Sequence, residues 1–310
     1  MKNALKIIGI ILLVMIILIV ILLIWLLNKP TVPNNYFNTV KTGGAIEAKY
    51  IKMGKHSVSN TKLNVMENFK SYEIWYPSEI TLSDKKFSVI IMNNGTGVKA
   101  SKYKALFEHL ASWGFIVVGT EEEYSWNAFS SEMSLRLMIK LNENAHVPAW
   151  DTNPFYGKVD LEHIGVAGHS QGGVGAINAV TDTKHADMYK AIFAASTTNK
   201  ELADALEWDF DVTQIDIPVF LLAGTGKIDS ETILPLHKMH ALYEDIPSDT
   251  KIMVRRNDGD HGDMLYFADG YMTAFFMWQL QGDIEASKAF IGNDAEILSN
   301  NYYQDIKKNY

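Results

Sequence analysis

The chain has 310 residues, of which 47% are hydrophobic and 21% are charged, as is typical of a folded globular protein. Its formal net charge is −8, and no cluster of Lys and Arg interrupts the acidic balance, so no nucleic-acid partner is expected. The absence of cysteine excludes disulfides, thiolate metal sites and a cysteine nucleophile. The length suits a single large domain.

The chain begins with a candidate membrane segment. Residues 7–27 are 21 consecutive apolar residues, interrupted only by a neutral glycine, and at about 1.5 Å per residue they can span a bilayer core of about 30 Å. Lys2 and Lys6 precede this run, which favours a single-pass cell-membrane protein with a cytoplasmic N-terminus and an extracytoplasmic catalytic domain. The alternative is secretion after signal-peptide cleavage, although residues 25–30 lack a small-residue cleavage site.

The composition after the apolar run predicts the domain organisation. Residues 1–28 are the expected membrane anchor, and residues 29–44, with two prolines and paired Asn and Gly, read as a tether. Residues 45–291 are the expected catalytic domain, followed by a C-terminal tail, residues 292–310, with a terminal helix. Two strands around 47–57 and 70–76 are predicted to form an antiparallel sheet edge.

Strands and helices then alternate along the chain. The predicted strands are 88–92, 115–119, 163–167, 191–195, 219–223 and 251–255, and the predicted helices are 102–112, 134–144, 173–180, 234–243 and 266–280. Several strands are apolar throughout, which indicates a sheet covered on both faces. The sequence therefore predicts an α/β fold with a doubly wound, mostly parallel sheet and helices on both faces.

The strongest chemical signal is the motif Gly168-His169-Ser170-Gln171-Gly172. It directly follows a predicted strand and directly precedes a helix rich in small residues. This arrangement is typical of the nucleophile elbow of the α/β-hydrolase fold, in which a serine is held in a sharp strand-to-helix turn. A glycine-rich turn that merely contains a serine is the structural alternative. We predict Ser170 as a catalytic nucleophile.

A serine hydroxyl needs a base, and in this fold the chain order is Ser, then Asp or Glu, then His. Among the histidines after Ser170, His261 follows the last predicted strand in a loop, whereas His237 and His240 lie on a predicted helix. His261 is therefore the predicted general base. The alternative is a metal site that His261 shares with three carboxylates of its loop, Asp258, Asp260 and Asp263.

The acid that orients the base should follow the strand 219–223. Asp229 is the predicted acid and Glu231 the fallback, and either residue could instead serve as a helix cap. The oxyanion hole needs two backbone N–H groups, which we assign to Gln171 and to Thr96 in the glycine-rich loop 93–97.

With these residues placed, the chain resembles the bacterial cutinase, polyester hydrolase and lipase group of α/β-hydrolases, together with dienelactone-hydrolase and chlorophyllase-like sequences. The marks of this resemblance are the segments 72–77, 94–97, 110–118, 156–160, 168–172 and 276–283. The resemblance implies the triad Ser170, Asp229 and His261 with oxyanion donors Thr96 and Gln171. Thr96 stands where polyester hydrolases usually carry an aromatic residue, and 196–198 replaces their tryptophan.

We therefore expect a membrane-anchored serine hydrolase that cleaves a small-molecule or lipid-like ester without cofactor or metal. Tyr124 and Trp126, after the fourth strand, could line its substrate pocket. No obligate protein partner is evident from the sequence. A peptidase or amidase using the same triad, and a catalytically silent surface-anchored binding protein, are the alternatives.

Overall fold

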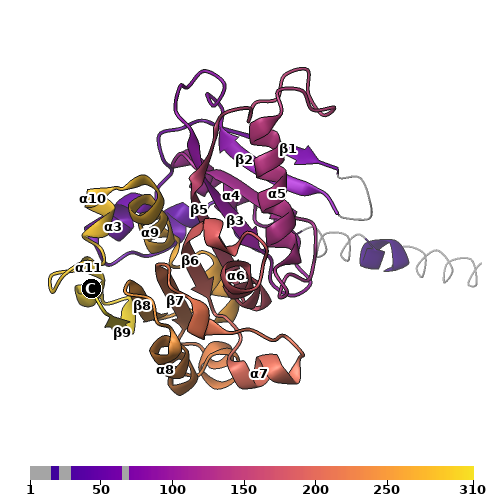
Figure 1. Ribbon diagram of the computed structural model, residues 1–310. Helices are drawn as coiled ribbons and strands as arrows, with labels where there is room; N and C mark the ends of the chain where they lie inside the picture. Colours follow the sequence, from indigo (N-terminus) through magenta and orange to yellow (C-terminus); the bar gives the residue numbers. More distant parts are fainter. Residues whose placement is uncertain (1–14, 21–28, 65–69) are drawn as a thin grey trace, which may run out of the picture.

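A computed structural model describes residues 15–20, 29–64 and 70–310 (Figure 1). The predicted membrane segment, residues 7–27, lies outside the described residues apart from 15–20, which are helical. None of the described helices has both the length and the apolar character needed to cross a membrane.

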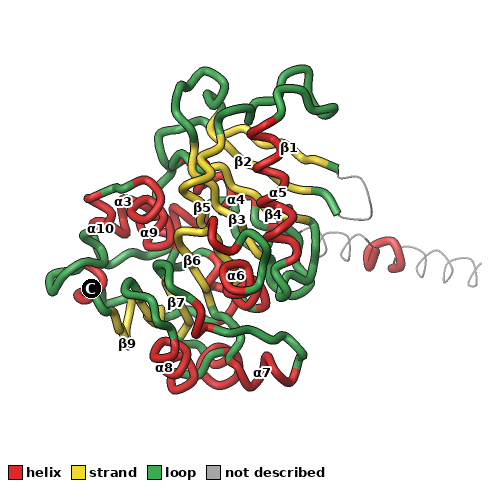
Figure 2. Tube along the Cα trace, viewed as in Figure 1, coloured by secondary structure: helices red, strands yellow, loops and turns green. Residues whose placement is uncertain are grey.

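One sheet of nine strands forms the centre of the described domain, in the order β1-β2-β4-β3-β5-β6-β7-β8-β9 (Figure 2). Strands β3 to β8 are parallel, whereas β1, β2 and β9 pair antiparallel with their neighbours. The strands are β1 (Val58–Leu63), β2 (Tyr72–Pro77), β3 (Phe87–Asn93), β4 (Ile116–Thr120), β5 (Val159–His169), β6 (Tyr189–Ala195), β7 (Val219–Gly224), β8 (Lys251–Arg256) and β9 (Tyr303–Lys308). The predicted mixed, mostly parallel sheet is confirmed.

Helices cover both faces of the sheet and enclose two separate cores. In β3, Ile90 faces one core and Ile91 the other, which explains why the strand is apolar throughout. One face carries α3 (Ala45–Tyr50), α4 (Lys104–Ser112), α9 (Asp269–Gln281), α10 (Ile284–Ser287) and α11 (Glu296–Ser299). The other carries α5 (Phe129–Glu143), α6 (Gln171–Thr181), α7 (Lys200–Ala205) and α8 (Leu236–Asp245).

The predicted strand 47–57 is wrong. Its first part is the helix α3, and the first strand of the sheet is β1, which begins at Val58. The segment 45–49 consists of Ala, Ile, Glu, Ala and Lys, mostly good helix formers, and Gly44 has an extended backbone at the N-cap. Helix propensity therefore decides this segment, whereas the predicted strand 70–76 corresponds to β2.

Two terminal segments pack more closely than their sequences suggest. Within residues 29–44 the short helix α2 (Tyr36–Thr39) forms, and the side chains of Val32 and Tyr36 are fully buried. In the tail, the short α11 is followed by the unpredicted strand β9, which pairs with β8.

Glu47 joins these two ends of the domain. Its buried carboxylate accepts hydrogen bonds from the backbone N–H of Gly43, from Asn300 Nδ2 at 2.7 Å and from the Tyr303 hydroxyl at 2.7 Å. Arg256, at the end of β8, places its Nη1 atom 3.7 Å from the same carboxylate. A buried charge needs such partners, so Glu47 fixes the N-terminal and C-terminal segments against each other.

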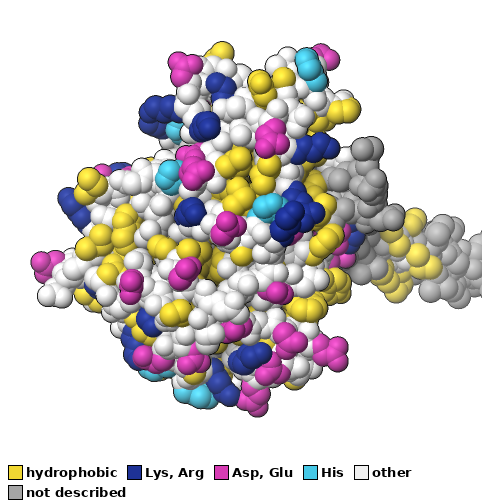
Figure 3. All heavy atoms as spheres, in the orientation of Figure 1, with side chains coloured by type: hydrophobic (Ala, Val, Ile, Leu, Met, Phe, Trp, Pro, Cys, Tyr) yellow, Lys and Arg dark blue, Asp and Glu magenta, His cyan; other side chains and the backbone are white. Residues whose placement is uncertain are grey.

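Acidic and basic side chains are interspersed over the face of the molecule shown in Figure 3, where no continuous basic stripe is visible. This pattern on the visible face agrees with the negative formal charge of the chain.

Candidate active site

Ser170 lies in a strained turn between β5 and α6. Its φ angle is +59°, a left-handed conformation that is uncommon for a residue with a side chain. The turn is possible because its flanking residues lack a Cβ atom. A Cβ at Gly168 would collide with the backbone of Gly172, and one at Gly172 would collide with the backbone of Asn93. The motif therefore has the strand-to-turn-to-helix geometry that a nucleophile elbow requires.

The structure brings Ser170, His261 and Asp229 into one hydrogen-bonded chain. His261 Nε2 lies 2.9 Å from Ser170 Oγ, and His261 Nδ1 lies 2.7 Å from Asp229 Oδ1. His261 begins the turn η5 (His261–Leu265) after β8, and Asp229 begins η4 (Asp229–Ile233) after β7. All three residues thus follow the carboxyl ends of parallel strands, at one edge of the sheet.

The two candidates for the acid occupy different environments. The Asp229 side chain is fully buried, and its Oδ2 atom accepts hydrogen bonds from the Gly224 N–H at 2.6 Å and from Ser196 Oγ at 2.5 Å. The Glu231 side chain is 64% exposed and lies 4.0 Å from Lys227. Of these two carboxylates, only that of Asp229 contacts His261, so the geometry favours Asp229 over Glu231 as the acid.

Backbone N–H groups are free at both predicted oxyanion donors. Gly95 donates its N–H to the Tyr103 hydroxyl, and Gly97 donates its own to the Glu123 carbonyl. Within the described part of the chain, the N–H groups of Thr96 and Gln171 have no hydrogen-bond acceptor. The Gln171 N–H also stands at the start of α6, where the helix dipole favours negative charge.

The chain matches the family model described as PET hydrolase-like over residues 38–294. This match covers well over half of the sequence. The chain belongs to the PET hydrolase-like family. Its membership confirms the resemblance to cutinase and polyester hydrolase sequences within the α/β-hydrolase superfamily.

Among curated proteins, the chain is similar to the chloroplastic chlorophyllase-1 of Citrus unshiu and to that of Citrus sinensis. Each is 27% identical over 146 residues, which cover 45% of this chain and 42% of the relative. The chain thus spans less than half the length of these relatives.

Asp260 connects the two loops that carry His261 and Asp229. Its Oδ1 atom accepts the N–H of His261 at 2.8 Å and that of Asp229 at 3.1 Å, while Oδ2 accepts the Ile228 N–H at 3.2 Å. Burial raises the pKa of Asp260, but these N–H groups outweigh burial and hold the pKa below its usual value. This PET hydrolase-like chain therefore uses one carboxylate to fix both loops.

This role of Asp260 could not be predicted from the sequence, because an Asp-rich turn resembles a solvated or metal-binding loop. The carboxylates of Asp260 and Asp263 instead accept backbone N–H groups of the loop itself. Over the described ranges, no three His, Asp or Glu side chains come together in an arrangement that could hold a metal ion.

The His169 ring packs against the His261 ring and is hydrogen-bonded to the His261 backbone. Its Nε2 atom lies 2.6 Å from the His261 carbonyl, and the centres of the two rings are 4.6 Å apart. Burial, together with the nearby His261 ring, lowers the pKa of His169 to about 4. The ring is therefore neutral at pH 7 and donates its Nε2 hydrogen to the carbonyl. From the sequence alone, His169 is recognisable only as part of the motif around Ser170.

The predicted pocket residues take different positions. Tyr124 is 64% exposed in the segment after β4. Trp126 is partly buried against the core, and its backbone carbonyl accepts a hydrogen bond from Asn178 Nδ2.

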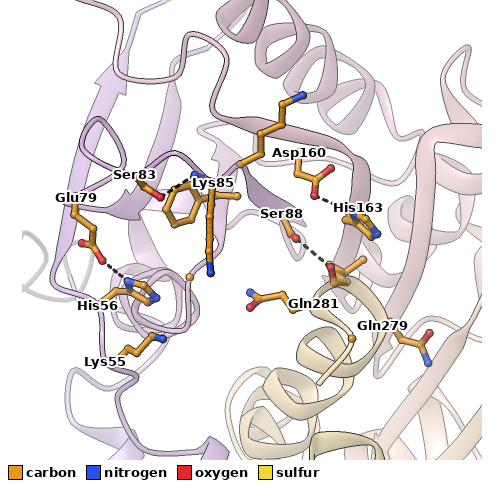
Figure 4. A pocket seen from close by; sticks show the side chains of 15 residues that line it. Lys55, His56, Glu79, Ser83, Lys85, Ser88, Asp160, His163, Gln279 and Gln281 are labelled. Carbon is orange, nitrogen blue, oxygen red and sulfur yellow. Dashed lines mark hydrogen bonds and ion pairs between the residues drawn. The ribbon is translucent and has the colours of Figure 1, made fainter. Parts of the chain in front are cut away.

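The described residues also form a cavity of about 600 Å³, shown in Figure 4, at the amino ends of β3 and β5. Two His–carboxylate pairs line it, His56 with Glu79 and His163 with Asp160. That cavity is at the sheet edge opposite Ser170.

Proposed function

We propose that this protein is a serine hydrolase that cleaves carboxylic esters through an acyl-enzyme on Ser170. The observation that supports this most directly is the hydrogen-bonded chain from Ser170 Oγ through the His261 ring to Asp229. The free N–H groups of Thr96 and Gln171 and the family membership point the same way.

The reaction begins when Ser170 Oγ attacks the ester carbonyl carbon and its proton passes to His261 Nε2. The carbonyl oxygen becomes an oxyanion that the N–H groups of Thr96 and Gln171 stabilise. Asp229 holds the Nδ1 hydrogen of His261 and stabilises the imidazolium that forms. The tetrahedral intermediate then collapses, the C–O bond to the alcohol breaks, and His261 gives its proton to the departing alcohol.

Water completes the cycle. His261 removes a proton from a water molecule, whose oxygen attacks the acyl carbon of the acyl-enzyme. The second tetrahedral intermediate collapses, Ser170 recovers its proton from His261, and the carboxylic acid leaves. His261 therefore carries out every proton transfer of the reaction cycle.

We further propose that residues 7–27 anchor the enzyme in the cell membrane, with the catalytic domain on the extracytoplasmic side. The 21-residue apolar run and the preceding lysines Lys2 and Lys6 support this placement. A mature protein that begins after residue 28 in the native membrane fraction would instead establish signal-peptide cleavage.

Ser170→Ala tests the mechanism. The variant should lose labelling by a fluorophosphonate and retain ester turnover of only about 10³–10⁴-fold over water, supplied by binding and the oxyanion hole. Mass spectrometry of the labelled wild type should place the adduct on Ser170. An adduct on another serine, or full activity in the variant, would contradict the proposal.

Two substrates separate the proposal from its alternatives. Turnover of a p-nitrophenyl ester without turnover of a peptide anilide favours the esterase over a peptidase or amidase. Absence of both activities and of fluorophosphonate labelling would indicate a binding protein.

A further inference from the structure

The fixed part of the chain begins only a few residues after the apolar run. The Thr31 N–H donates to the Lys102 carbonyl at 3.1 Å, and Val32 is fully buried. Further along, the buried Tyr36 hydroxyl donates to Asp269 Oδ2 at 2.6 Å. The predicted tether is therefore held against the domain from Thr31 onward.

This point of attachment lies on the catalytic edge of the sheet. Lys102 ends the turn η1 (Ala100–Lys102), which follows the loop that carries Thr96. The next residue, Tyr103, accepts the Gly95 N–H of that loop. The segment then contacts the end of β8, because Arg256 Nη2 donates to the Lys41 carbonyl at 2.5 Å. Both contacts are at carboxyl ends of parallel strands, where Ser170 and His261 also lie.

The length of the free connection restricts how the domain can turn. Three residues separate Leu27 from Thr31, so the two Cα atoms are at most about 14 Å apart. A globular domain of about 280 residues has a radius of gyration of about 19 Å, so the attached edge cannot turn away from a membrane that holds Leu27. Had the whole segment to Ala45 been free, its reach of about 60 Å would have allowed any orientation.

Large exposed apolar side chains are present on the same edge. Tyr124 and Phe129 follow β4 and are 64% and 55% exposed, and Ile228, beside Asp229, is 52% exposed. Side chains of this kind bury favourably at the boundary between headgroups and acyl chains.

We propose that the catalytic edge faces the bilayer that anchors residues 7–27, and that the substrate is an acyl ester carried by a lipid of that bilayer. The inference rests on the proposed esterase function and on the anchor. It makes esters in the enzyme's own membrane, rather than a distant polymer, the natural substrate.

Two matched single-cysteine variants of the full chain test the orientation, since the chain has no native cysteine. Lys227→Cys places a probe on the catalytic edge beside Ile228, and Lys85→Cys places one on the opposite edge, in the cavity of Figure 4. Each is labelled with a fluorophore and reconstituted in phosphatidylcholine/phosphatidylglycerol vesicles that contain a headgroup nitroxide lipid. We expect clearly stronger quenching at position 227. Equal quenching, stronger quenching at position 85, or failure of the full chain to stay with the vesicles would overturn the proposal.

A lengthened connection tests the substrate class. Inserting about 20 Gly/Ser residues between Asn28 and Lys29 lengthens the free connection roughly sixfold. Because effective concentration falls with about the −3/2 power of tether length, turnover of a fluorogenic phospholipid ester in the same vesicles should drop about 15-fold. Turnover of dissolved p-nitrophenyl butyrate by the same variant should not change.

If the insertion left the ratio of the phospholipid rate to the p-nitrophenyl butyrate rate unchanged, the proposal of a lipid substrate would be wrong. If the chain without the insertion turned over neither of the two esters, the proposed esterase function would be refuted. The quenching experiment would still decide the orientation of the domain.

Discussion

Replacing Asp260 by alanine should lower kcat about 100-fold while the domain stays folded. The carboxylate accepts three backbone N–H groups, from His261, Asp229 and Ile228. Hydrogen bonds to a charged group contribute about 1.5–3 kcal/mol each, but water can replace part of them at this partly exposed side chain, so we expect a loss of about 2–3 kcal/mol in unfolding free energy. A displacement of about 1 Å between His261 and Asp229 is enough for a 100-fold rate loss.

Asp260→Asn is the matched control, because its amide oxygen can still accept the N–H groups of Asp229 and His261. Steady-state hydrolysis of a p-nitrophenyl ester should show kcat within about tenfold of the wild type for Asn, and KM little changed for both variants. Thermal unfolding measures the stability loss. If Asp260→Ala lowered stability but left kcat and the rate of fluorophosphonate labelling unchanged, the carboxylate would have no positioning role.

Further substitutions probe the residues around Asp229 and His261. Asp229→Asn should lower kcat about 10⁴-fold, whereas Glu231→Gln should change little, and reversed kinetics would move the acid to Glu231. Ser196→Ala removes a hydrogen-bond donor to the Asp229 carboxylate and should lower kcat, and an unchanged kcat would exclude a role of Ser196 in positioning Asp229. Because the folded pKa of His169 is about 4 and the unfolded value about 6.5, the wild type should lose stability as pH falls from 6.5 to 4, and His169→Gln should lose less in urea titrations.

The Asp260 carboxylate also predicts an acid limit for the site. Its folded pKa is below the unfolded value of about 3.9, so its contribution to stability is complete above that pH and is lost as pH falls through the folded pKa. Urea unfolding below pH 4 should therefore show a smaller pH dependence in Asp260→Asn than in the wild type. Equal slopes would show that the carboxylate is not stabilised in the folded state.

Most of the sheet could be predicted because its signals are local. The apolar runs of β3 and β7 and the glycines around Ser170 determine their own conformations within a few residues. The order of Ser170, an acid and His261 also follows from the fold class. The choice between Asp229 and Glu231 could not be made locally, because it depends on which side chain the η4 turn buries.

Features that depend on distant partners were missed. The strand β9 reads as polar, Tyr-Gln-Asp-Ile-Lys-Lys, and its pairing with β8 depends on residues about 50 positions earlier. The closing of residues 29–44 onto the domain likewise needs Lys102 and Asp269. In the sequence Asp260 looks like a solvated turn residue, because the N–H groups of the Asp229 loop that it binds lie about 30 residues earlier in the chain.

The position of Glu47 also has a consequence for how the chain is made. Its carboxylate is buried near the start of the domain, yet two of its hydrogen-bond donors, Asn300 and Tyr303, lie 253 and 256 residues later in the chain. Until these residues leave the ribosome, the carboxylate and Arg256 have no complete set of partners. This corner of the domain therefore closes only after residues 300–303 have been made, so its first and last segments have to fold together.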